Sequence, residues 1–132
     1  MKKEYIIAIG VIIILIFVFF LIRGDEDSWI KNEKGEYIKH GVPSETPDYV
    51  LEQQQAVTQA FELYNKKQKE GMVFSSQCLG VVGEEVKYAV DIVNVPRNDE
   101  DDKPENQCSE FREGIVEQFI ELDQEGKIVR IV

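Results

Sequence analysis

The sequence predicts an α+β protein: an N-terminal transmembrane helix, then one long helix packed on an antiparallel sheet of about four strands, with a small hairpin before that long helix. Three observations lead to this prediction. Residues 6–22 of the 132-residue chain carry no charge. Residues 47–70 place apolar side chains at helical spacing, and the later residues contain four apolar runs separated by turn residues. One helix followed by several strands is the element order of an α+β domain.

The charge-free run, residues 6–22, contains only Ile, Val, Leu and Phe apart from Ala8 and Gly10. With Tyr5 added, a helix over this run is ~27 Å long at 1.5 Å per residue, just enough for a hydrocarbon core of about 30 Å. The run ends in bulky residues, whereas a signal peptide ends in small ones. We therefore expect an uncleaved anchor that contacts the lipid bilayer through residues 6–22.

Lys2 and Lys3 precede the apolar run, and positive charge is retained on the cytoplasmic side of a membrane. We therefore expect a single-pass cell-membrane protein with its N-terminus in the cytoplasm. Residues 1–22 form the cytoplasmic tip and membrane helix, residues 23–27 a short linker, and residues 28–132 a small extracytoplasmic domain. The opposite orientation is the alternative, because the bias is only a couple of charges.

Residues 23–132 hold 24 acidic and 13 basic side chains, a net charge of −11. This excess of negative charge opposes binding to phosphates, so nucleic acid is excluded as a partner. The segment is also too small for most barrel or doubly wound enzymes.

Residues 28–40 predict the small hairpin, with strands at residues 29–31 and 36–39 and Gly35 in the left-handed position of the turn. The long helix is then expected to start after Thr46 as N-cap, with Pro47 at its first position, and to stop at Gly71. Its predicted apolar stripe consists of Val50, Val57, Ala60, Phe61 and Tyr64.

Four strands are expected at residues 72–79, 86–95, 115–122 and 127–132. The last two form a hairpin around the tight turn Asp123–Gly126. The polar connection between the second and third strands is expected to project as an acidic loop.

The closing segment FIELDQEGKIVRIV, residues 119–132, resembles the last hairpin of NTF2-like and cystatin-like proteins. The resemblance covers about fourteen residues and implies an α+β fold. Residues 79–83 lack the Gln of the cystatin inhibitor loop, so protease inhibition is not implied. By analogy with NTF2-like enzymes that move protons, Asp91, Glu117 and Glu121 are candidate acids in a sheet concavity; the alternative is that they are solvated surface carboxylates.

Cys78 and Cys108 are the only cysteines, and their separation of 30 residues fits neither a C-x-x-C redox motif nor a four-ligand zinc site. In an oxidising compartment this predicts a disulfide, which would stabilise the domain by up to ~3.7 kcal/mol. The alternative is two free thiols.

The remaining polar residues do not form a recognisable cofactor or metal site, so neither a cofactor nor a metal is predicted. His40 is the only histidine and lies in no recognisable catalytic motif, so a structural or surface role is expected. The acidic run 99–105 departs from an EF-hand, because Lys103 and Pro104 occupy positions that need a ligand and a glycine. A solvated loop is expected there, and calcium binding stays open.

Trp29, Tyr37 and Tyr49 form a possible recognition patch, with packing on the domain as the alternative. The leading functional hypothesis is a non-enzymatic, membrane-tethered module that binds an extracytoplasmic protein or envelope component. The alternative is a small-ligand binder or enzyme with an NTF2-like cone between helix and sheet. A deep pocket with a buried carboxyl group would favour the ligand binder or enzyme. A filled core with an exposed apolar patch would favour the interaction module.

Overall fold

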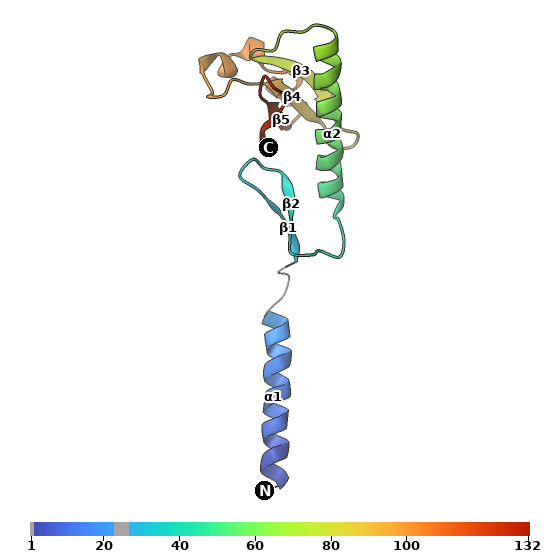
Figure 1. Ribbon diagram of the computed structural model, residues 1–132, viewed down its shortest axis with the longest axis vertical. Helices are drawn as coiled ribbons and strands as arrows, with labels where there is room; N and C mark the ends of the chain where they lie inside the picture. The colour runs from blue at the N-terminus through green and yellow to red at the C-terminus, as the bar shows by residue number, and fades with distance from the viewer. Residues whose placement is uncertain (1, 23–26) are drawn as a thin grey trace.

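The computed structural model describes residues 2–22 and 27–132 (Figure 1). Helix α1, Lys2–Ile22, lies at one end of the molecule. The remaining elements form an α+β domain with a two-stranded and a four-stranded sheet. Most of the predicted linker, residues 23–26, lies outside the described residues.

Within residues 2–22 and 27–132, no helix has both the length and the apolar character needed to cross a membrane. The prediction of a transmembrane helix is therefore wrong. The described side chains of α1 begin with the charged residues Lys2, Lys3 and Glu4. These charges occupy part of the length that a continuous apolar span of about 20 residues would need.

The predicted hairpin is confirmed as strands β1, Ser28–Lys31, and β2, Tyr37–His40. A two-stranded hairpin is marginally stable on its own, so its contacts with the domain matter. The Gln53 side chain accepts a hydrogen bond from the Tyr37 amide (2.8 Å) and donates one to the Gly35 carbonyl (2.9 Å). The Ile131 amide donates to the Lys34 carbonyl (2.7 Å). The hairpin is thus attached to both the long helix and the large sheet.

The long helix α2 is Asp48–Lys69, and Gly71 follows it with a φ of +83°. Its N-cap is Pro47, which makes no side-chain capping bond, so the predicted role of Thr46 is wrong. Because Pro47 takes the extended cap conformation itself, Thr46 lies one residue too early to reach the first-turn amides.

The buried face of α2 consists of Val50, Gln53, Ala56, Ala60 and Tyr64. Their spacings of three and four residues follow one helical stripe. Phe61 lies beside this stripe and is 36% exposed, so its predicted place in the core is wrong.

The large sheet has the order β3-β4-β5-β6: Gln77–Val82, Tyr88–Ile92, Gln118–Leu122 and Ile128–Ile131. Strands β4 and β5 are parallel, whereas the two outer pairs are antiparallel. The predicted all-antiparallel sheet is therefore wrong. The 25 residues 93–117 between β4 and β5 are long enough to return the chain to the same end of the sheet, which a parallel pair requires.

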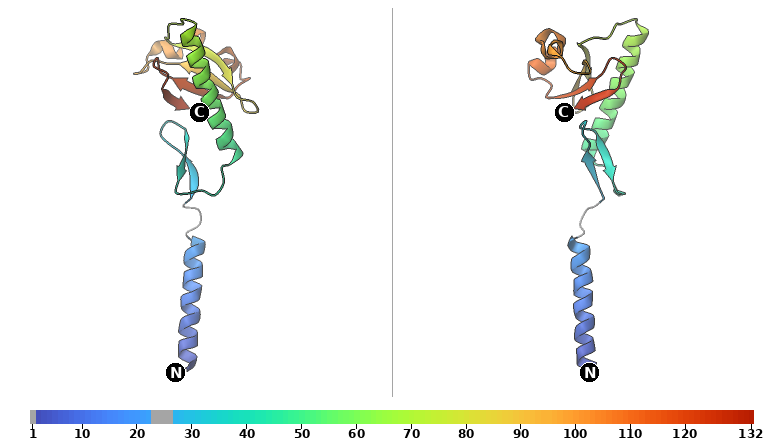
Figure 2. Two further views of the ribbon diagram at one scale, coloured as in Figure 1. Left: turned by 45° about the vertical axis from the view of Figure 1, so that its right-hand side comes forward. Right: turned by 60° about the vertical axis from the view of Figure 1, so that its left-hand side comes forward.

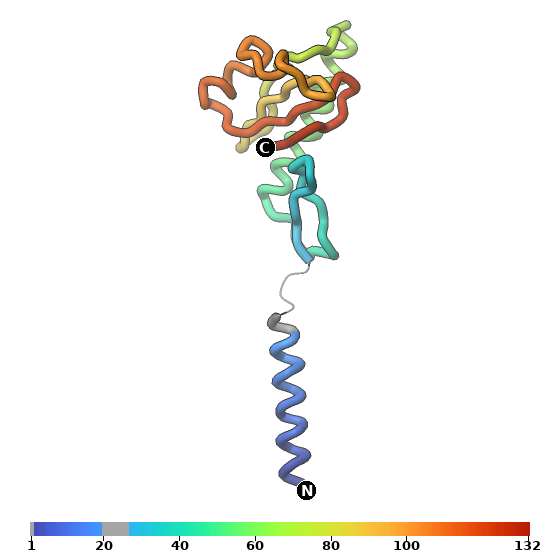
Figure 3. Tube along the Cα trace, turned by 90° about the vertical axis from the view of Figure 1, so that its left-hand side faces the viewer, coloured from blue at the N-terminus to red at the C-terminus, as the bar shows by residue number. Residues whose placement is uncertain are grey.

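Residues 93–117, here called the crossover, contain the short helices η1 (Asp99–Asp102), η2 (Pro104–Asn106) and α3 (Ser109–Arg112). Figure 2 shows α2 on one face of the sheet and the crossover on the other, and Figure 3 views the crossover face. The crossover is therefore a covering layer and not the projecting loop that the sequence predicts.

Each face of the sheet has its own core. On the crossover face, Ala89 of β4 packs against Cys108 and Val116 of the crossover in a small buried cluster. On the α2 face the larger core is filled by side chains from the helix and all four strands: Ala56, Ala60, Tyr64, Leu79, Tyr88, Val90, Ile92, Ile120, Leu122 and Ile131. The interface in which the sequence placed a ligand cone is thus a packed core.

Candidate functional site

One row of side chains crosses the whole sheet beneath the crossover. Cys78, Asp91, Glu121 and Arg130 are register partners on β3, β4, β5 and β6 respectively. Side chains in such a row lie side by side on the same face of a sheet. The row brings together two sequence-predicted candidates, Asp91 and Glu121, with one of the two cysteines.

The predicted disulfide between Cys78 and Cys108 is confirmed, and the two Cα atoms are 4.8 Å apart. Cys78 belongs to the edge strand β3, whereas Cys108 belongs to the crossover just before α3. The bond therefore ties the covering layer to the sheet.

Asp91 lies against this disulfide and is 8% exposed. Its Oδ1 atom is 3.2 Å from Cys108 Sγ, and because a disulfide sulfur carries no hydrogen, this contact is not a hydrogen bond. Burial raises the pKa of Asp91 to about 6, and the charge of Glu121 adds to the effect. The Cys108 backbone amide and the charge of Arg97 oppose the rise in this pKa.

The ligand atoms of Cys78, Asp91 and Cys108 all lie within 4.8 Å of one another. Metals bind cysteine as the thiolate, and in the disulfide neither sulfur is a thiolate. In the oxidised protein this cluster therefore does not provide a thiolate metal centre.

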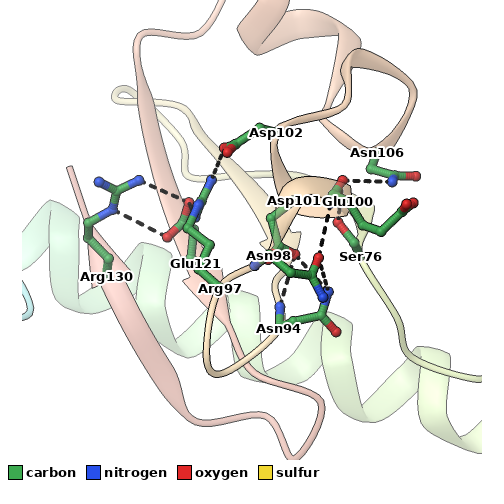
Figure 4. Close-up of polar contacts among 10 residues, drawn as sticks. All are labelled: Ser76, Asn94, Arg97, Asn98, Glu100, Asp101, Asp102, Asn106, Glu121 and Arg130. Atoms are coloured by element: carbon green, nitrogen blue, oxygen red, sulfur yellow. Dashed lines mark hydrogen bonds and ion pairs between the residues drawn. The ribbon is translucent and has the colours of Figure 1, made fainter.

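Glu121, the next residue in the row, is 5% exposed and is paired with two arginines (Figure 4). It accepts a hydrogen bond from Arg97 at 2.8 Å and two from Arg130 at 3.1 and 3.2 Å. Arg97 also donates to Asp102 at 2.9 Å, and these acidic partners raise the pKa of Arg97. Both positive charges are therefore directed at Glu121, and Asp91 has no such ion pair among the described residues.

Part of the acidic run of the crossover makes hydrogen bonds and ion pairs within the protein (Figure 4). Asp101 accepts hydrogen bonds from the backbone amides of Asn94 and Asn98, both at 2.9 Å. Burial alone would raise the pKa of Asp101, but these amide bonds, together with a hydrogen bond from Ser76 and the charge of Arg97, lower that pKa. Glu100 is bonded to Lys103 at 2.6 Å. Apart from Asp101, residues 99–105 are exposed, so the run is in contact with solvent as predicted, but it is folded into the short helices η1 and η2.

A cavity of about 80 Å³ lies between the row and the crossover. It is lined by both acids, both arginines and two aromatic rings: Asp91, Arg97, Glu121, Arg130, Phe111 and Phe119. Pockets for small organic ligands are typically about 300–1,000 Å³, so this cavity has room only for something as small as water. Glu117 is exposed and does not line the cavity, so only two of the three predicted acids come together.

The predicted aromatic patch is brought together in part. The rings of Tyr37, on β2, and Tyr49, on α2, have centroids 5.0 Å apart. Trp29 instead donates its indole N–H to the Glu45 carbonyl at 3.0 Å. The exposed His40 ends β2 and lines neither this patch nor the cavity under the crossover.

Tyr37 and Tyr49 line a notch between the hairpin, α2 and the sheet, here called the tyrosine notch. Its volume is about 80 Å³, and its lining includes Lys31, Tyr37, Tyr49, Glu52, Tyr88 and Gln118. The Oε1 atom of Gln118 is buried, and no residue in the described part of the chain donates a hydrogen bond to it.

Glu52 and Val86 also line a neighbouring hollow of about 160 Å³, together with Gln55, Glu84 and Glu85. The tyrosine notch therefore continues into a group of three carboxylates.

The sequence analysis missed Gln118 as a site residue, although the sequence contained one signal for it. Gln118 has the strand parity of the core residues Ile120 and Leu122, so a polar side chain takes an inward position.

No family model matches the chain, and no match was found among curated proteins or solved structures. The fourteen-residue resemblance to NTF2-like and cystatin-like proteins therefore carries no function to this chain. The parallel pairing of β4 with β5 also departs from the antiparallel meander on which that resemblance depended.

Proposed function

We propose that residues 27–132 form a binding module that recognises a basic segment of a partner protein in the tyrosine notch. The observation that carries this proposal is the buried Oε1 atom of Gln118, which has no donor among the described residues. An unsatisfied buried acceptor costs ~1–3 kcal/mol, and such groups are rare in native proteins. A donor supplied by a partner would recover this free energy on binding.

The chemistry around Gln118 selects a positively charged donor. The faces of tyrosine rings attract cations, and the Lys31 ammonium already lies 5.1 Å from the centroid of the Tyr37 ring. The carboxylates of Glu52, Glu84 and Glu85 extend the notch on one side. An arginine or lysine of the partner that displaces Lys31 would meet rings, carboxylates and the free acceptor together.

The net negative charge of residues 27–132 also favours a basic partner. Residues 27–132 contain 22 acidic and 12 basic side chains, a net charge of −10. Such a field accelerates association with basic surfaces. The disulfide favours an oxidising compartment, so we expect the partner protein in the same compartment.

The alternative of a small-ligand binder or enzyme has one observation in its favour, the buried Asp91 with its raised pKa. The cavity beside it holds only about 80 Å³, and Glu121 is already paired with Arg97 and Arg130. The interaction module is therefore the better-supported function.

The proposal can be tested with a tetra-arginine peptide blocked at both ends, titrated into the ¹⁵N-labelled full chain. We expect the side-chain amide signals of Gln118 and the backbone signals of Tyr37 and Tyr49 to shift together. A tetra-citrulline peptide of the same shape but without charge should leave these signals in place. Shifts spread evenly over acidic surfaces would contradict a specific notch.

Variants locate the site. Gln118→Met removes the acceptor at nearly constant side-chain size, and a hydrogen bond to a charged donor contributes ~1.5–3 kcal/mol. We therefore expect the peptide Kd to rise at least about tenfold. Glu84→Gln should also weaken binding, whereas Glu62→Gln, an exposed acid on another part of α2, should leave the Kd unchanged. Equal effects of the two glutamate substitutions would show that only overall charge matters.

A further inference from the structure

The two sulfurs of the disulfide have different surroundings. Cys108, in the crossover, is fully buried, whereas Cys78 belongs to an edge strand and is partly exposed. A thiolate from solution would therefore reach Cys78 first, because access decides which sulfur is attacked. Cys108 would then be the leaving sulfur.

The leaving sulfur is next to a carboxyl group. Asp91 Oδ1 is 3.2 Å from Cys108 Sγ, and Asp91 lines the cavity of about 80 Å³ beneath the crossover. Three groups act on Asp91 from neighbouring elements: the Cys108 backbone amide, the Glu121 carboxylate of β5 and the Arg97 guanidinium. Since Arg97 and Arg130 are bonded to Glu121, the Asp91 carboxyl is buried without an ion pair to any residue that the structure describes.

A buried carboxyl in this position does not help a disulfide whose only role is to brace the domain. Burying an acid without a positive partner costs free energy, and an apolar side chain on β4 would cover the sulfur without that cost. The position is chemically useful if Cys108 has to accept a proton when the bond breaks.

We propose that the Cys78–Cys108 disulfide is exchangeable with an external dithiol, that the dithiol attacks Cys78, and that Asp91 donates the proton that Cys108 takes up. The attacking thiolate forms a new S–S bond with Cys78 Sγ and breaks the bond between the two cysteines. The electron pair stays on Cys108 Sγ, which takes the proton of the Asp91 carboxyl.

The second step completes the balance. The second sulfur of the dithiol loses its proton to solvent and attacks the dithiol sulfur that is bonded to Cys78. The dithiol leaves as an intramolecular disulfide. Cys78 leaves as a thiolate and takes a proton from solvent, and Asp91 is reprotonated through the adjacent cavity. Two electrons pass from the dithiol to the protein, which then holds two thiols.

Exchange would change how the sheet is covered. The disulfide is the covalent link between the crossover and β3, and its Cys108 packs with Ala89 and Val116 in the small core on this face. Reduction leaves this layer held by packing and hydrogen bonds alone. The redox state would thus set how firmly the crossover closes on the row of charged side chains.

The test is the rate at which dithiothreitol reduces the full chain between pH 5 and pH 8, measured by alkylation and mass spectrometry. Each rate is divided by the dithiothreitol thiolate concentration. For the wild type we expect this normalised rate to fall as the pH rises through about 6, where Asp91 loses its proton. Asp91→Asn should be at least about tenfold slower at pH 5.5 and show no such fall. Asp99→Asn, the matched control at an exposed carboxylate of the crossover, should behave like the wild type.

Two further measurements separate exchange from unfolding. Ile120→Ala, a core substitution on the other face of the sheet that is expected to lower stability, should not speed direct reduction. Brief treatment with the monothiol glutathione should place glutathione on Cys78 and leave Cys108 as a free thiol. A rate that is independent of dithiothreitol concentration and follows global unfolding, or glutathione found on Cys108, would overturn the proposal.

Discussion

Replacing Gln118 by methionine is expected to stabilise the free protein, an unusual sign for a change at a half-buried position. The Oε1 atom of Gln118 is buried without a donor among the described residues, and such an acceptor costs ~1–3 kcal/mol. Methionine has nearly the same length and flexibility and carries no strong acceptor. We therefore expect the free energy of unfolding to rise by ~1–2 kcal/mol, equivalent to several degrees in Tm.

Urea unfolding, followed by circular dichroism, measures this difference. The control is Gln54→Met, an exposed position on α2, where the same substitution should change the free energy of unfolding by less than about 0.5 kcal/mol. A loss of stability greater than about 1 kcal/mol at Gln118 would show that its acceptor is satisfied in the free protein, for example by bound water. That result would remove the observation on which the proposed function depends.

Three further predictions concern the fold. Gln53→Ala should cost ~1–3 kcal/mol, because it removes both bonds to the hairpin, and hydrogen exchange should show faster exchange in β1 and β2 than in β4. Ile120→Ala should cost ~2–5 kcal/mol in urea unfolding, whereas Phe61→Ala, at a 36% exposed position, should cost clearly less; equal costs would contradict the observed helix face. Because Asp91 has a raised pKa of about 6 against an ordinary 3.8, the folded state binds the extra proton, and stability should fall by up to ~3 kcal/mol as the pH rises from about 4 to above 6. Asp91→Asn should abolish that part of the pH dependence, and an unchanged profile would show that Asp91 is not the titrating group.

Several local features could be predicted from the sequence because neighbouring residues decide them. Gly35, Gly71 and Gly126 have positive φ and end the hairpin turn, the long helix and the last turn where the sequence places them. The disulfide joins residues 30 apart and is not a local feature, but it was predictable because the chain has only two cysteines. The charge-free run of residues 6–22 also gave a clear helix, but the inference of a membrane span was wrong.

The direction in which β4 and β5 pair was decided only by the tertiary structure. Each strand has the same sequence whether its neighbour is parallel or antiparallel, and the choice depends on where the 25 residues of the crossover pack. The same choice buries Asp91 and Glu121, which the strand pattern alone could equally place in solvent. The row from Cys78 to Arg130 combines residues from four strands, so only the register of the folded sheet could reveal it. Turns and helix ends depend on the conformational limits of adjacent residues, whereas this site depends on contacts between segments far apart in the chain.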